Sequence, residues 1–168
     1  QWWTDKGVLI GQSVEGWSYL TTPIPLTSQY AITLRALPEP GTHLGLVLGR
    51  HAAGDYPYHT LLAFDGRELI ARRVKGPNAI ETLVQRPMTL PQDRWSTIHL
   101  ELNKGILLVN VNGHDVLAAR LSTPATSLFG VYVERGRARV HEPMLYPMAG
   151  RASGPSSSPP PRPPHHGN

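Results

Sequence analysis

Alternating hydrophobic and polar residues recur in short runs along the first 150 positions of the chain. Residues 30–37 place Ile32, Leu34 and Ala36 on one face, and residues 43–50 place three leucines opposite two glycines. A side-chain period of two is typical of a strand with one buried face. Helical periodicity is nearly absent, and prolines recur too often to leave room for a long helix. The pattern therefore predicts strands at 30–37, 43–50, 58–64, 68–74, 94–102, 106–111, 115–121, 129–134 and 138–141.

Turn residues separate these runs. Asp65-Gly66 and Asn112-Gly113 are typical of tight hairpin turns, Asn103-Lys104-Gly105 is expected to reverse the chain, and Arg135-Gly136 is expected to join two further strands. Short strands spaced every 8–12 residues are typical of an antiparallel sandwich or barrel rather than an α/β fold. We predict an all-β fold, an antiparallel two-sheet β-sandwich of the jelly-roll type.

Glycine and proline account for 16 and 17 of the 168 residues, and they fall into two groups. Most lie between predicted strands, where turns require them. The others are concentrated at residues 149–168, a Pro- and Ser-rich segment with almost no apolar side chain to bury. Because such a segment cannot offset its ordering entropy, we predict a β-sandwich domain at 1–148 and a flexible, disordered tail at 149–168. Alternatively, the PPPRPP stretch at 159–164 forms polyproline II and docks on a protein partner, as in a structural or assembly module.

Charge and hydropathy exclude two classes of protein. The chain has 16 basic and 12 acidic residues and a formal net charge of +4, but two of its arginines belong to the tail. A nucleic-acid surface requires clustered basic residues interleaved with aromatic ones, whereas Arg135, Arg137 and Arg139 alternate with small residues, which favours the outer face of a strand. No apolar run approaches the roughly 20 residues of a membrane span. We expect neither a nucleic-acid partner nor a membrane span.

The absence of certain residues and motifs excludes several kinds of catalytic and binding chemistry. Cysteine is absent, which excludes disulfides, a thiol nucleophile and thiolate metal sites. The sequence contains no phosphate-binding loop, no dinucleotide fingerprint and no calcium-binding run, so we expect no cofactor and no metal. The opening QWWTDKGVLIG lacks the basic start and long apolar centre of a secretory signal, so either a signal has been removed or the chain is a fragment of something longer.

The run at 94–102 carries one candidate group. His99 and Glu101 share a face with Thr97, opposite a clean apolar face. Such a row suits contacts to sugar hydroxyls, and it is also what any half-solvated strand shows. Retaining glycoside hydrolysis needs two carboxylates about 5 Å apart. The nearest candidate partner for Glu101 is Glu134, on another strand.

A second candidate group surrounds Pro57 in a predicted loop, the kind of segment where binding residues concentrate. It consists of Arg50, Tyr56, Tyr58 and His59. Aromatic rings stack on the apolar face of a pyranose, and polar groups beside them fix its hydroxyls. The alternative is that these aromatics only cover the edge of the sandwich. Trp95, at the start of a strand, is expected in the core.

Three stretches carry a family resemblance. In residues 93–121 (DRWSTIHLELNKGILLVNVNGHDVLAARL) a Trp opens a strand, a hairpin follows, and Val111-Asn112-Gly113 leads into the next strand, which resembles a recurring unit of the concanavalin A-like lectin/glucanase superfamily. Residues 127–147 (SLFGVYVERGRARVHEPMLYP) are similar to the last strands of that fold. Residues 2–50 are similar to the laminin-G-like domain of the 3-keto-disaccharide hydrolase family. The Glu-x-Asp-x-x-Glu strand of the glucanase branch is missing.

The resemblance implies a lectin-like, non-catalytic carbohydrate-binding or recognition module that works outside the cytoplasm, in a periplasmic or secreted setting. It also leaves open a sugar-acting hydrolase of the 3-keto-disaccharide kind, with His99, Glu101 and Arg50 as catalytic residues. The predicted ligand is a saccharide or glycan, and its predicted contacts are Arg50, Tyr56, Tyr58, His59, His99 and Glu101.

Overall fold

The computed structural model describes residues 1–23, 29–53, 56–76, 78–121, 128–141 and 144–147. For residues 17, 21–23, 49–53, 56–58, 128 and 144–147 it describes the backbone alone. All the secondary-structure elements in these ranges are β-strands, as the sequence predicts. No helix in them is long and apolar enough to cross a membrane. The strands are β1 (Trp2–Asp5), β2 (Val8–Pro23), β3 (Gln29–Pro38), β4 (His43–Ala53), β5 (Tyr56–Phe64), β6 (Glu68–Gly76), β7 (Ala79–Pro87), β8 (Ser96–Asn103), β9 (Ile106–Val111), β10 (His114–Arg120), β11 (Leu128–His141) and β12 (Met144–Pro147).

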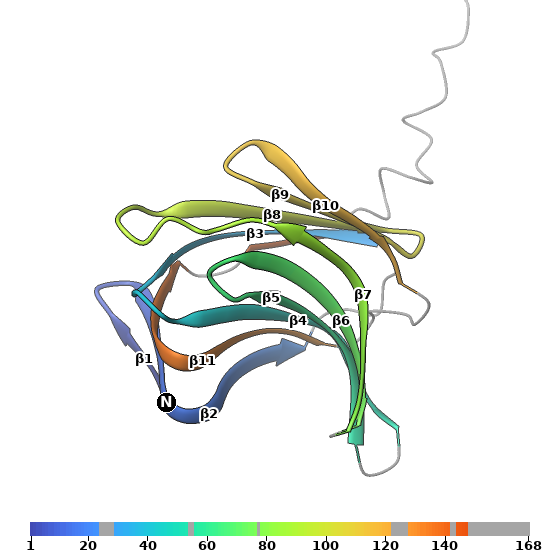
Figure 1. Ribbon diagram of the computed structural model, residues 1–168, viewed down its shortest axis with the longest axis horizontal. Coiled ribbons are helices and arrows are strands. Elements are labelled where there is room, and N and C mark those ends of the chain that lie inside the picture. Colours follow the sequence, from blue (N-terminus) through green and yellow to red (C-terminus); the bar gives the residue numbers. More distant parts are fainter. Residues whose placement is uncertain (24–28, 54–55, 77, 122–127, 142–143, 148–168) are drawn as a thin grey trace, which may run out of the picture.

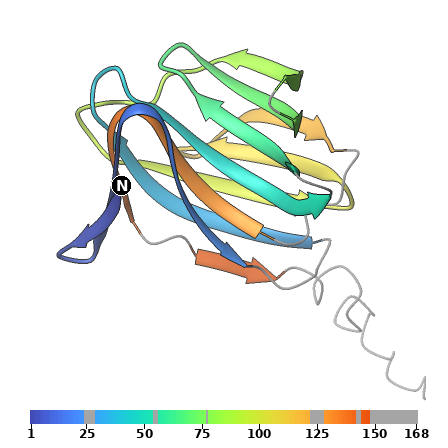
Figure 2. The ribbon, with the colours of Figure 1, turned by 90° about the horizontal axis from the view of Figure 1, so that it is seen from below.

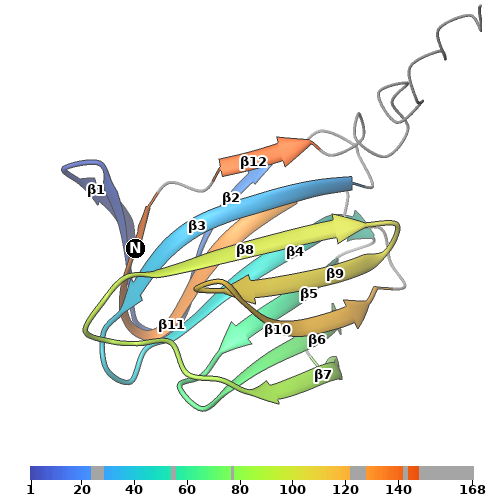
Figure 3. The same ribbon diagram turned by 90° about the horizontal axis from the view of Figure 1, so that it is seen from above.

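The strands form two packed layers (Figures 1 and 3). One layer contains β10, β9, β8 and β3 in that order, with β12 beside β3. The other contains β4, β5, β6 and β7, seen from below in Figure 2. All neighbours within the layers are antiparallel. This arrangement confirms the predicted two-sheet jelly roll.

The long strand β11 connects the two layers. Its residues 129–134 pair with β4, and its residues 138–140 pair with β3 in the other layer. Strand β2 follows β11 from Val8, opposite His141, to Pro23, opposite Leu128. The two neighbouring strands therefore both pass from one layer to the other, as the blue and orange ribbons in Figure 2 show.

A bulge makes this passage possible, and it corrects one prediction. Arg135 and Gly136 both have positive φ angles (53° and 140°), and the register with β2 shifts at this point. A Cβ atom on Gly136 would overlap the hydroxyl of Thr42, so only glycine fits. Thr42 Oγ1 accepts a hydrogen bond from the backbone N–H of Arg137 and donates one to its carbonyl, each at 3.0 Å. Arg135-Gly136 is therefore a bend within one strand, and the separate strands predicted at 129–134 and 138–141 are halves of β11.

The hydrophobic core lies between the layers and uses the faces that the alternation predicts. Buried side chains from both layers meet there, among them Ile32, Leu34, Ala36, Leu44, Leu46, Leu48, Leu62, Phe64, Ile98, Leu100, Leu102, Val109 and Val131. Trp95 is not part of this core, contrary to prediction. Its half-buried indole contacts the ring of His141, with centroids 4.8 Å apart, and the guanidinium of Arg35.

Candidate functional site

The layer that contains β4–β7 is concave on its outer side. Its strands curl away from the β3–β8–β9–β10 layer toward their far ends (Figure 1). We call this outer surface the concave face. Residues at alternate positions of β4, β5, β6 and β11 point to it, because their neighbours in sequence point into the core.

Two tyrosines lie on the concave face where β2 and β11 form its edge. Tyr132 on β11 is paired with Tyr19 on β2 and with Gly45 on β4, and the two rings have centroids 5.9 Å apart. The Tyr132 ring covers Gly45, where a Cβ atom would overlap it. Tyr132 is only 2% exposed, whereas Tyr19 is 38% exposed. The glycine therefore lets one ring lie against the sheet, and this buried ring supports an exposed one.

The floor beside the tyrosines is apolar. Val47, Leu61, Ala63 and Val74 are buried there in one cluster with Tyr132. An antiparallel sheet commonly has one buried face and one polar, solvated face. Here the middle of the layer is apolar on both sides, and these four side chains are at most 5% exposed, so they form a small second core on the outer side of the layer.

Ionisable side chains lie on the same face as the tyrosines. His43 Nδ1 and Glu134 Oε2 are 3.8 Å apart on neighbouring strands. Burial raises the pKa of the Tyr132 phenol, the charges of Glu134 and Asp65 raise it further, and Arg72 opposes them. Tyr132 is therefore neutral at physiological pH, with the phenol intact.

Asp65 remains ionised in this setting. Its partial burial by itself would raise its pKa, but the backbone N–H groups of Arg67 and Glu68 each donate to Oδ1 at 2.9 Å. Together with the charges of His43 and Arg72, these bonds lower the pKa of Asp65 below its ordinary value. The concave face thus offers both anionic acceptors and a cationic donor beside the tyrosine pair.

The predicted group around Pro57 belongs to this same layer. Tyr56 and Tyr58 pair with Ala53 and His51 in the β4–β5 ladder, so the prediction that they lie in a loop is wrong. Their side chains, and that of Arg50, lie outside the described residues. His59 pairs with Val74 and is 6% exposed, so it is a buried part of the concave face.

His99 and Glu101 lie on the opposite side of the sandwich. The sequence places them on one face of β8, and the structure confirms this: His99 Nε2 is 3.2 Å from Glu101 Oε1, and His99 Nδ1 is 2.8 Å from Thr33 Oγ1. When the Glu101 carboxylate accepts from Nε2–H, a neutral ring leaves Nδ1 to accept from the Thr33 hydroxyl. Leu108, Asn110 and Asp115 line the same open hollow of about 420 Å³, which we call the His99 hollow.

The two predicted groups therefore do not form one site. His99 and Glu101 face outward from one layer, whereas Arg50, Tyr56, Tyr58 and His59 belong to strands of the other. The predicted carboxylate pair of Glu101 and Glu134 is wrong for the same reason, because Glu134 lies on the concave face. Glu101 instead shares its hollow with Asp115. In the part of the chain that the structure describes, no three His, Asp or Glu side chains could hold a metal ion together.

Sequence reasoning missed the tyrosine pair and the charges around it. One signal for it is present in the run at 43–50, where glycines occupy the face opposite the leucines. A glycine on the outward face of a strand marks a place where another group approaches the backbone closely. The identity of that group, Tyr132, follows only from the pairing of β4 with β11.

Solved structures share this fold at low sequence identity. The carbohydrate-binding module CBM66 from Bacillus subtilis matches with a TM-score of 0.69 and 12% identity, over 87% of this chain and 91% of its own. Sheep galectin-11 matches with a TM-score of 0.59 and 12% identity, over 80% and 99%. A candidate glycosyl hydrolase from Parabacteroides distasonis matches with a TM-score of 0.64 and 8% identity, over 87% and 83%. No protein-family model matches the chain, and no curated protein matches it either.

These comparisons establish the class of fold. The chain is a jelly-roll β-sandwich of the kind seen in CBM66 and galectin-11. At such identities the likeness concerns the fold alone, and function has to be argued from the residues of this chain.

Proposed function

We propose that this protein is a non-catalytic carbohydrate-binding or recognition module whose saccharide lies on the concave face. The observation that carries this proposal is the tyrosine pair above Gly45. The Tyr132 ring covers Gly45, Tyr19 is exposed beside it, and the charges of Glu134, Arg72 and Asp65 act on Tyr132. A saccharide ring has one apolar face and a rim of hydroxyls, and this surface is complementary to both features.

Each group has a part in this binding. The apolar face of a pyranose packs on Tyr19, and its hydroxyls donate to the carboxylates of Asp65 and Glu134. Arg72 and His43 supply donors to ring and hydroxyl oxygens. Hydrogen bonds to charged groups contribute about 1.5–3 kcal/mol each, so loss of one such partner weakens binding by about tenfold or more.

The predicted contacts on β4 and β5 are a separate part of the proposal, at the ends of these strands beyond His59. Arg50, Tyr56 and Tyr58 follow on the same two strands as Gly45 and His59. We propose that Tyr56 and Tyr58 contact further sugar units and that Arg50 bonds their hydroxyls. We further propose that the protein works outside the cytoplasm, in a periplasmic or secreted setting, and the sequence resemblance to lectin-like domains supports this.

Calorimetry with neutral oligosaccharides found by glycan-array screening tests the proposal. Tyr19→Ala and Arg72→Ala should each weaken binding at least tenfold, and Tyr56→Ala and Tyr58→Ala should weaken it further. Trp95→Ala is the matched control, because it removes a half-buried aromatic from the other layer. Absence of any saccharide ligand, or an equal loss in the Trp95 control, would refute the proposal.

A second candidate function, a sugar-acting hydrolase, has a specific observation in its favour. The His99 hollow contains two carboxylates, Glu101 and Asp115, and the ring of His99 is fixed between Glu101 and Thr33. Glycosidases use two carboxylates, one as an acid and the other as a nucleophile or base. In this alternative Glu101 and His99 carry the reaction, on a 3-keto-disaccharide or a related glycoside. Arg50, the third predicted catalytic residue, belongs to the other layer.

Turnover assays distinguish the two functions. The hydrolase alternative expects release of monosaccharide from oxidised disaccharides, lost in Glu101→Gln and His99→Ala but retained in Tyr19→Ala. No turnover by the unaltered protein would eliminate it. The third alternative, an assembly module that uses the tail at 149–168, concerns residues outside the described ranges and stays a prediction. Deletion of 149–168 should abolish partner binding under that alternative and leave saccharide binding intact.

A further inference from the structure

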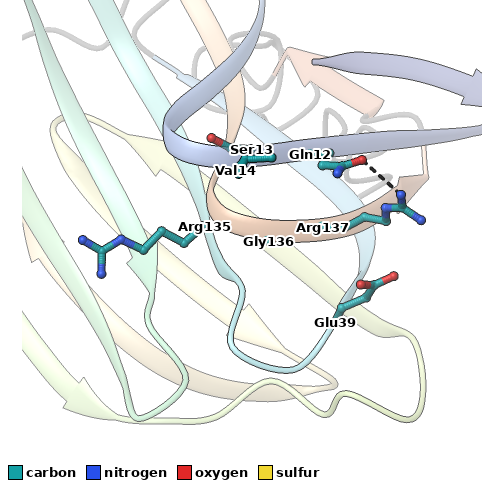
Figure 4. A pocket seen from close by; sticks show the side chains of 7 residues that line it. All are labelled: Gln12, Ser13, Val14, Glu39, Arg135, Gly136 and Arg137. Carbon is teal, nitrogen blue, oxygen red and sulfur yellow. Dashed lines mark hydrogen bonds between the residues drawn. The ribbon is translucent and has the colours of Figure 1, made fainter.

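A second hollow lies where β2 and β11 bend between the layers. It is open, measures about 590 Å³, and is lined by residues 12–14 of β2, residues 135–137 of β11 and Glu39 (Figure 4). We call it the bulge hollow. None of its lining residues belongs to the tyrosine pair or to the charged groups around it. It is therefore a separate surface, formed by the bulge itself.

Arg137 is held in a fixed position at one end of the bulge hollow. Its Nη2 donates to Gln12 Oε1 at 3.0 Å, and its guanidinium carbon lies 5.6 Å from the centre of the Trp3 ring. Thr42 fixes the backbone of the same residue through two hydrogen bonds. No carboxylate among the described residues forms an ion pair with it. A half-buried guanidinium with five N–H groups is thus oriented by neutral partners and retains donors for a ligand.

Arg135 supplies the second cation, on the other side of Gly136. Figure 4 shows its guanidinium pointing away from that of Arg137, so the prediction that the arginines of 135–139 share one outer strand face is wrong for Arg135. Its φ of 53° is left-handed, a conformation that Asn or Gly adopts at less cost. The bulge explains the conformation, but the backbone has no need of an arginine there. Its exposed side chain extends the positive charge across the hollow.

Glu39 restricts what can bind. It lies near Arg137 in Figure 4 and would repel an anion placed against it. A ligand complementary to the hollow therefore has an anionic group for Arg137 and neutral hydroxyls for Glu39 and Gln12. Two cations that point to opposite sides suit an extended ligand that carries more than one anion.

We infer that the bulge hollow binds the carboxylate groups of an acidic saccharide chain. Arg137 donates two parallel hydrogen bonds to one carboxylate, and Arg135 binds the next carboxylate along the chain. The planar guanidinium matches a carboxylate in geometry as well as in charge. Glu39 accepts ring hydroxyls and fixes the direction of the chain. The inference rests on the proposed function only in that the ligand is a saccharide, and its site is distinct from the concave face.

Calorimetry on the full chain with a galacturonate oligomer tests this inference, with a galactose oligomer of equal length and polyglutamate as comparison ligands. Galacturonate should bind at least tenfold more tightly than either. Arg137→Gln should weaken galacturonate binding at least tenfold, and Arg137→Lys, which keeps the charge and the packing stem, should also weaken it severalfold because the two parallel hydrogen bonds are lost. Arg135→Asn should weaken binding severalfold without lowering Tm, since Asn tolerates the left-handed conformation.

Arg139→Gln is the matched control, because Arg139 is an exposed arginine of the same strand that does not line the hollow. It should change binding by less than twofold. The inference is overturned if galacturonate does not bind, if polyglutamate binds as tightly, or if the control loses as much affinity as Arg137→Gln. Tyr19→Ala should leave galacturonate binding unchanged, so failure of the concave-face proposal and failure of this one give different results.

Discussion

Substitution of Gly45 by alanine tests the geometry of the concave face directly. Gly45 has an ordinary strand conformation, so alanine is compatible with its backbone, and the obstacle is the Tyr132 ring that occupies the place of the added methyl. Either the ring moves outward or the two strands separate slightly. In both cases the support for Tyr19 is disturbed, so stability and saccharide binding should fall together.

The size of the effect follows from the contacts. Burial of an aromatic side chain removes about 150–250 Å² from water, so complete expulsion of the ring would cost about 4–6 kcal/mol. Partial displacement is the expected response, at the roughly 1–3 kcal/mol typical of an extra methyl in a packed site. Replacing a strand glycine by alanine otherwise stabilises the folded state by about 0.5–1 kcal/mol, because alanine has less conformational freedom in the unfolded chain. We therefore expect a net loss of about 1–2 kcal/mol and a Tm lower by about 2–8 °C.

Urea unfolding and calorimetric Tm measurements check this value, with Gly76→Ala as the control. Gly76 is also a strand glycine with ordinary φ, and its nearest neighbour to an added Cβ is Ala79 at 3.8 Å. That control should lie within about 0.5 kcal/mol of the unaltered protein. The double variant Gly45→Ala with Tyr132→Ala should lose less stability than the sum of the single changes. Equal stability of Gly45→Ala and the unaltered protein, with unchanged binding, would refute the reasoning.

Three further predictions concern the stability of the sandwich. Gly136→Ala should cost more than about 2 kcal/mol in urea unfolding, because its φ of 140° and the Thr42 hydroxyl both oppose a Cβ atom; a smaller loss would mean that the bulge can relax. Leu62→Ala should cost about 2–5 kcal/mol, since this side chain is fully buried between the layers. Asp65 has a lowered folded-state pKa, so its contribution is complete above its ordinary pKa of 3.8 and is lost as the pH falls through the folded value. Asp65→Asn, which keeps an acceptor for the turn, should flatten the urea-stability curve in that acidic window and lower stability at neutral pH; an unchanged curve would contradict the assignment.

Local patterns were sufficient to predict the core strands. In residues 30–36 of β3, 44–48 of β4 and 98–102 of β8, every second residue is apolar and buried, and this period can be read directly from the sequence. Strand β7 was missed because its residues are mostly exposed and carry no such period. Strand β2, with 16 residues, was missed because glycines interrupt it and its main partner, β11, is 100 or more residues away. Both are strands whose existence depends on a neighbour more than on their own residues.

The bend at Arg135-Gly136 shows a second reason for failure. Lys104-Gly105 and Asn112-Gly113 also have positive φ at both residues, and there the chain does reverse in a hairpin. In the sequence all three places are a polar residue followed by glycine, and the larger φ of Gly136 (140°, against 78° and 87°) is visible only in the structure. Only the pairing of β11 with strands of both layers decides that the chain continues at residue 136.

For the candidate sites too, features set within one strand could be predicted, and features set by the pairing of distant strands could not. That His99 and Glu101 share a face follows from the period of one strand, and it was predicted. Their separation from Tyr56 and Tyr58 depends on which layer each strand joins, and no local pattern contains that information. The contact of Tyr132 with Gly45 likewise joins strands far apart in the sequence.

The position of β11 late in the sequence has a consequence for how the protein is made on the ribosome. Until residues 128–141 have been synthesised, β3 lacks its pairing with residues 138–140, β4 has an open edge, and the long strand β2 has no partner except β1. The nascent chain therefore exposes unpaired strand edges, which are prone to association with other chains, for most of its synthesis. A chain released at residue 127 should be digested rapidly by a protease that spares the complete domain; equal resistance would show that the layers close without β11.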